Sequence, residues 1–154
     1  MTRLNTDSPQ IFESLSKASP DQRKAAMLDA CKHALHAVSL PSVHKFTDTL
    51  DALAHHQSIS AANQTELALL ADKFDEEYFS LHQQAEDNPS SPPDYMLAFR
   101  RARAVSALLY ASRDSSVESV AESIYEAAQA AENKENIYAA VNSILHAAQR
   151  STLR

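Results

Sequence analysis

The chain of 154 residues contains no glycine, and this absence limits the possible folds more than any other feature of the sequence. Tight β-hairpins and most backbone positions with positive φ favour glycine, because a residue without a Cβ atom meets no steric penalty there. An all-β or α/β fold is therefore a poor match. Alanine, the best helix former, is abundant instead. The composition predicts an all-α protein.

The missing glycine also excludes several kinds of enzyme site. Walker-type phosphate loops, G-x-G-x-x-G dinucleotide turns and G-x-S-x-G nucleophile elbows all need glycine for backbone reasons. The sequence also lacks the H-E-x-x-H and Glu-x-x-His patterns of zinc and di-iron sites. We therefore expect a protein that is not an enzyme and that uses no cofactor.

Hydrophobic periodicity predicts a single-domain helical bundle of six to seven helices over residues 1–154. Ser8 and Ser19 each precede a proline, which is a typical helix start. Ser115 and Glu118 have the spacing of a capping box. We expect residues 1–8 to be disordered and 87–93 to form a loop. The expected helices cover 8–18, 19–40, 43–53, 61–86, 91–112, a segment after Ser115, and 137–148.

Charge argues against nucleic acid as a partner, and the lack of long apolar stretches argues against a membrane. The formal net charge is −6, from 20 acidic and 14 basic residues, so the basic surface that binds nucleic acid is missing. No stretch approaches the roughly 18 consecutive apolar residues of a membrane span. The first residues lack the apolar core of a signal peptide. With only one cysteine, Cys31, no internal disulfide is possible. We expect a soluble cytosolic protein that binds neither nucleic acid nor membrane.

Arg100, Arg101 and Arg103 lie close together in the helix expected over 91–112, whose other residues are almost all apolar. A buried guanidinium keeps its charge and needs carboxylates or carbonyls as partners. One interpretation is structural ion pairing within the chain. The other is that Arg101 or Arg103 binds an anionic ligand or a carboxylate of a partner protein. The candidate internal partners are acids of the long helix: Asp72, Asp75 and Glu76.

Two groups of acids are candidate binding surfaces for a basic protein. Glu118, Glu122 and Glu126 are four residues apart and form a row opposite the apolar stripe of their helix. This row is either a solvated face or a docking strip.

In the long helix, Leu69 and Phe79 lie outside the core stripe, among Asp72, Asp75 and Glu76. A large aromatic residue among carboxylates is typical of an interface anchor inside a charged rim. The alternative is that a second helix covers this face.

His44, Asp48, Asp51 and His55 share one helical face. These residue types can bind a divalent metal, but exposed contacts one turn apart explain them as well, and we expect no metal. Cys31 belongs to an apolar stripe, so we interpret it as a buried structural thiol.

The stretches AFRRARAVSALLYA and ESIYEAAQAA, within residues 98–131, resemble small all-helical bacterial proteins encoded beside toxins as their immunity partners. The resemblance implies an antitoxin-like protein that binds one cognate basic toxin or enzyme and covers its active site. The residues that it would use are Asp72, Asp75, Glu76, Phe79, Glu118, Glu122 and Glu126.

The alternative function is a helical structural or regulatory module that associates with itself, for example as a homodimer. The alanine strip Ala104, Ala107 and Ala111 and the alanines of 127–131 would allow close helix packing between copies.

Overall fold

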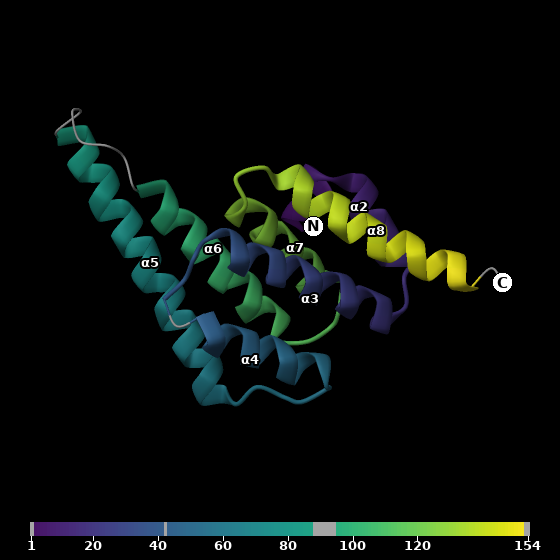
Figure 1. The fold of residues 1–154 in the computed structure, drawn as a ribbon. Helices are drawn as coiled ribbons and strands as arrows, with labels where there is room; N and C mark the ends of the chain where they lie inside the picture. The colour runs from purple at the N-terminus through teal and green to yellow at the C-terminus, as the bar shows by residue number, and fades with distance from the viewer. Residues whose placement is uncertain (1, 42, 88–94, 153–154) are drawn as a thin grey trace.

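The chain folds into a bundle of α-helices (Figure 1). The computed structural model describes residues 2–41, 43–87 and 95–152, with the backbone alone for 148–152. Within these ranges there are eight helices and no strand, which confirms the all-α bundle predicted from the composition. The helices are α1 (Arg3–Asp7), α2 (Pro9–Lys17), α3 (Pro20–Ala37), α4 (Val43–Ala54), α5 (Ala61–Asp87), α6 (Tyr95–Ala111), α7 (Val117–Ala130) and α8 (Lys134–Thr152).

Helices α3, α6 and α7 form the centre of the bundle. Helix α6 packs between α5 and α7, and α3 contacts α4, α6, α7 and α8. The short α1 lies on α7, and α2 contacts α7 and α8. Leu35, Leu108 and Ile124 are among the fully buried side chains at this centre. The alanines of α6 and α7 are buried as well, which lets these helices approach closely.

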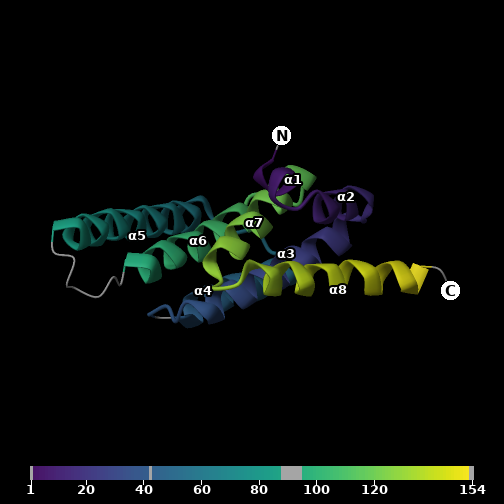
Figure 2. The same ribbon diagram turned by 90° about the horizontal axis from the view of Figure 1, so that it is seen from above.

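The second half of α5 and the beginning of α6 project from the bundle as an arm (Figures 1 and 2). Aromatic rings from the two helices contact each other there. The centre of the Tyr78 ring lies 5.9 Å from the centre of the Tyr95 ring and 5.4 Å from that of the Phe99 ring. The ring of His82 lies 5.0 Å from Tyr95. Such pairs each contribute about 0.5–1.5 kcal/mol beyond simple burial, so the arm is stabilised by its own side chains.

The residue that caps the start of the helix is the predicted one at α3 but not at α7. At α3, the Ser19 hydroxyl accepts a hydrogen bond from the Gln22 amide, and the Gln22 side chain accepts one from the Ser19 amide. At α7 the capping residue is Ser116, and the expected cap at Ser115 is wrong. Asp114 accepts a hydrogen bond from the Ser116 amide at 2.9 Å, which moves the start of the helix one residue along the chain.

The expected disorder of residues 1–8 is wrong for 2–8. Thr2 caps α1 by accepting a hydrogen bond from the Asn5 amide, and Leu4 is fully buried in the core. A single apolar residue among polar ones is a weak sequence signal, yet here it anchors the segment. The loop expected at 87–93 lies outside the described residues, except for Asp87 at the end of α5.

In the absence of glycine, two of the described residues that follow helices have a positive φ, which is the left-handed backbone that glycine favours. Ser39 after α3 has φ 49°, and His56 after α4 has φ 59°. The His56 amide donates to the Leu53 carbonyl at 3.1 Å, and the Gln57 amide donates to the Ala52 carbonyl at 2.9 Å. These two bonds make a Schellman motif, in which glycine usually occupies the position of His56.

We predict that His56→Gly increases the free energy of unfolding by about 0.5–1 kcal/mol, because relief of the left-handed strain exceeds the added chain entropy. The measurement is urea denaturation followed by circular dichroism. His55→Gly is the matched control, since the φ of His55 is not positive, and it should destabilise the protein. Equal destabilisation by both substitutions would contradict the prediction.

Candidate functional site

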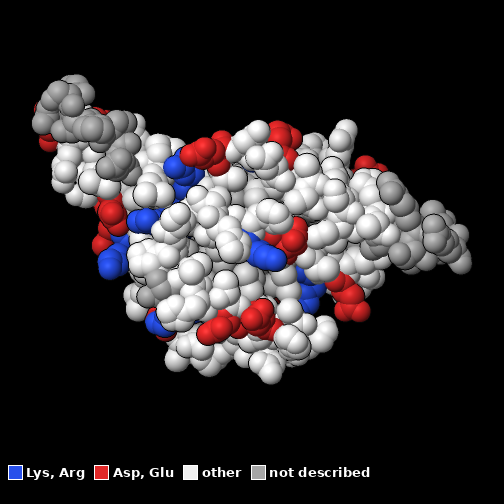
Figure 3. Space-filling model, in the orientation of Figure 1, with Lys and Arg blue, Asp and Glu red and all other residues white. Residues whose placement is uncertain are grey.

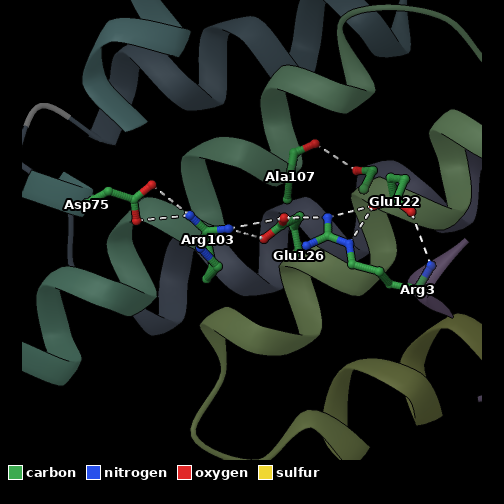
Figure 4. Close-up of polar contacts among 7 residues, drawn as sticks. Arg3, Asp75, Arg103, Ala107, Glu122 and Glu126 are labelled. Carbon is green, nitrogen blue, oxygen red and sulfur yellow. Dashed lines mark hydrogen bonds and ion pairs between the residues drawn. The ribbon is translucent and has the colours of Figure 1, made fainter. Parts of the chain in front are cut away.

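Arg103 lies at the centre of a chain of charged side chains that crosses the bundle (Figure 4). Its Nη2 donates to both carboxylate oxygens of Asp75, at 3.0 and 2.9 Å. Its Nη1 donates to both oxygens of Glu126, at 3.2 and 3.0 Å. The Nε of Arg103 is buried and has no hydrogen-bond partner in the described part of the chain. The guanidinium of Arg103 thus binds two carboxylates of the same chain, those of Asp75 and Glu126.

Arg3 continues this chain from the other side of Glu126. Its Nη2 lies 2.7 Å from Glu126 Oε1 and 2.6 Å from Glu122 Oε2, and its guanidinium stacks 4.5 Å from the centre of the Tyr125 ring. Burial alone would lower the pKa of Arg3, but the hydrogen bonds and charges of Glu122 and Glu126 outweigh it and raise the pKa. Arg3 therefore stays charged and fastens α1 to α7.

A second set of polar contacts fastens the other end of α1. Asp7 accepts hydrogen bonds from Lys134 Nζ at 2.8 Å and from the Tyr138 hydroxyl at 2.5 Å. These bonds, first from Lys134 and then from Tyr138, lower the pKa of Asp7. Burial raises the pKa of Tyr138, and the hydrogen bond to Asp7 adds to the increase. Helix α1 is therefore held by α7 at one end and by α8 at the other.

The two other arginines of α6 also have internal contacts. Arg101 Nε donates to the Val38 carbonyl at 3.2 Å and its Nη2 to the Ser39 carbonyl at 3.0 Å. A cation at the C-terminal end of α3 is favourable because the last carbonyls of a helix carry partial negative charge. Arg100 lies 3.8 Å from Glu132. All three arginines thus contact the chain itself, as the structural interpretation expected, although the partners of Arg101 are carbonyls.

The acidic row of α7 is not a free docking strip, which corrects the expectation for two of its members. Glu126 is only 2% exposed and lies between Arg103 and Arg3. Glu122 pairs with Arg3. Only Glu118 is exposed and makes no side-chain hydrogen bond or ion pair in the described ranges.

The sequence carried a signal for this burial that periodicity alone does not reveal. Glu126 has alanines on neighbouring faces of α7, at Ala127 and Ala130. Because alanine allows helices to approach from several sides, the buried surface of α7 extends well beyond its stripe of large apolar residues. A glutamate inside such a surface needs a cation, and Arg103 and Arg3 supply it.

The outer face of α5 keeps most of its predicted residues free. Asp75 pairs with Arg103, as noted above. Asp72 and Glu76 are exposed, and neither carboxylate takes part in a hydrogen bond or ion pair among the described residues. Leu69 is 64% exposed and Phe79 67% exposed, so no second helix of the described chain covers this face.

Helix α5 also carries a charge equal to that of the whole protein. It contains seven acids and one lysine, against 20 acids and 14 bases in the full chain, which leaves 13 of each sign elsewhere. On the face in Figure 3, acidic and basic side chains are scattered among uncharged ones, and both kinds occur at the outer edge over α5. By this count, the net negative charge of the chain equals that of α5, and the rest of the chain is neutral overall.

The remaining candidates are structural or exposed. Burial raises the pKa of Cys31 to about 12, and its thiol lies 3.3 Å from the Ser123 hydroxyl, so it is a poor nucleophile. His44, Asp48 and Asp51 are exposed on α4, and His55 is exposed directly after it. No group of three or more possible metal ligands occurs in the described part of the chain. None of the described helices is long and apolar enough to cross a membrane.

The alanines considered for self-association face the interior of the bundle. Ala104 and Ala107 are fully buried, and Ala111 is nearly so. Ala127, Ala128 and Ala130 are also buried, and Ala131 is partly buried against the core. They pack α6 and α7 within one chain and are not exposed to a second copy.

Comparison of this chain with protein-family models, with curated proteins and with solved structures found no match.

We predict that Glu126→Gln lowers the free energy of unfolding by about 3 kcal/mol, because it removes the buried countercharge of Arg103, whose side chain is 18% exposed. Glu118→Gln is the matched control on the same helix and should change stability by less than about 0.5 kcal/mol. Urea denaturation of both variants measures the difference. Similar small effects of the two substitutions would show that the buried chain of charges does not stabilise the fold.

Proposed function

We propose that this protein is a non-catalytic binding module whose partner is a basic protein, contacted through the outer face of α5. The observation that carries the proposal is the coincidence of charge and apolar exposure on one helix. Helix α5 holds a net charge of −6. It also holds the two most exposed large hydrophobic side chains of the described residues, Leu69 and Phe79.

The two properties have different roles in association. Concentrated negative charge steers a basic partner toward the helix and increases the rate of encounter. Exposed Phe79 then provides the large apolar contact that typically supplies most of the binding energy of an interface. Asp72 and Glu76 lie between Leu69 and Phe79 along the helix and have carboxylates free to pair with the partner.

The concrete form of the proposal is an immunity protein that inhibits a cognate basic toxin or enzyme. The resemblance of residues 98–131 to such proteins motivates this form. The interface residues are now Asp72, Glu76 and Phe79 of α5. Asp75, Glu122 and Glu126 are engaged within the chain, and Glu118 is left out because it lies on another helix, α7. Self-association has less support, since its alanines are buried.

We predict that tagged protein captures one basic partner in equimolar amount from its native host, and that the double variant Asp72→Lys/Glu76→Lys loses it. Glu118→Lys/Glu135→Lys is the matched control: it makes the same charge change at exposed positions of α7 and α8 and should retain the partner. The measurement is quantitative mass spectrometry of the captured proteins. Recovery of the chain alone, or loss of the partner only with the control variant, would contradict the proposal.

A further inference from the structure

The exposed residues of α5 form a line with the spacing of a helix-packing seam. Successive members are three and four residues apart, and each is exposed. Such a spacing keeps side chains in one row along a helix, which is the arrangement that a second helix contacts in a coiled coil. We call this row the α5 stripe: Leu69, Asp72, Glu76, Phe79, Gln83 and Glu86.

Resting on the proposed function, we infer that the partner docks on the α5 stripe with a basic amphipathic α-helix. The partner helix places basic side chains opposite Asp72 and Glu76 and apolar side chains opposite Leu69 and Phe79. Because each residue adds about 1.5 Å to a helix, the two apolar positions are about 15 Å apart. A partner helix therefore matches them with apolar residues ten or eleven positions apart.

A hollow beside Leu69 provides a recess for one of these apolar side chains. It has a volume of about 380 Å³ and lies between the beginning of α4 and α5. Its lining includes Phe46 and Leu70 at the core side and Lys73 at the edge. An exposed ion pair, Lys45 Nζ to Glu66 Oε1 at 2.7 Å, lies at its border. At the Leu69 end of the α5 stripe, an apolar side chain of the partner can therefore enter a hollow.

Charge selects this occupant over the alternatives. The stripe has three carboxylates and no basic residue. A second copy of the chain docked by the same stripe would bring together two surfaces of the same negative charge, with three carboxylates on each, which is unfavourable. Nucleic acid has the same sign of charge as the stripe. A helix with lysine or arginine in its seam is complementary to the stripe in both charge and spacing.

A designed peptide tests the inference without knowledge of the natural partner. The probe is a dye-labelled helical peptide of 21 residues, with leucines ten positions apart and lysines at the seam positions between them. Its control has the same composition, with the lysines moved to the opposite face. Fluorescence anisotropy at near-physiological salt measures both affinities. We expect the probe to bind at least tenfold more tightly than its control.

Two neighbouring glutamates give the matched variants. Glu76 belongs to the stripe, whereas Glu77 lies about 100° further around the helix; both are exposed and neither makes a side-chain contact with an oppositely charged group in the described ranges. Glu76→Lys should weaken peptide binding at least tenfold and Glu77→Lys less than threefold. Phe79→Ala should weaken it at least tenfold as well.

The possible results separate the inference from the proposed function. Equal effects of Glu76→Lys and Glu77→Lys would indicate attraction to net charge alone and would overturn helical docking, as would equal binding of the probe and its control. If the native partner is nevertheless captured and is lost with Asp72→Lys/Glu76→Lys, the proposed function stands and only the helical form of the partner is wrong.

Discussion

The pairing of Arg103 with Glu126 is the interaction on which the arrangement of this bundle depends. Both groups are removed from water on the face where α6 meets α7, with side chains 18% and 3% exposed. Neither can be buried alone without a cost of several kcal/mol. The pair then recruits Asp75 from α5 and Arg3 from α1, so that the arm and the N-terminal helix are connected to the same charged centre.

This internal network also determines which acids are left for function. A chain with 20 acidic side chains presents many candidate binding surfaces. On α7, however, Glu122 and Glu126 are engaged in ion pairs within the fold and are not free to bind a partner. The carboxylates that remain unpaired beside exposed apolar side chains are on α5. Exposed Leu69 and Phe79 among these carboxylates have the composition of interface anchors inside a charged rim. The ion pairs that stabilise the fold thus decide which carboxylates are left to form a binding surface.

The sequence predicted the all-α bundle because the missing glycine disfavours tight turns throughout the chain, and the abundant alanine favours helix throughout it. It named Asp72, Asp75 and Glu76 together as candidate partners for the arginines of α6, of which the structure pairs Asp75 with Arg103. It left open whether a second helix covers Leu69 and Phe79, which the structure shows to be exposed. Periodicity did not reveal that Glu126 is buried, because alanines extend the buried surface of α7 beyond its stripe of large apolar residues. Arg3 and Asp7 were missed for another reason: their partners Glu122, Glu126, Lys134 and Tyr138 are more than 100 residues away in the chain.

The most direct test of this account is carboxylate labelling of the folded protein with a carbodiimide and an amine, with the rate at each residue measured by mass spectrometry. The account predicts fast labelling of Asp72, Glu76 and Glu118, slower labelling of Asp75, and very slow labelling of Glu126. Labelling of Glu126 as fast as that of Glu118 on the same helix would contradict the buried charge network. It would also return the α7 row to the surfaces available to a partner.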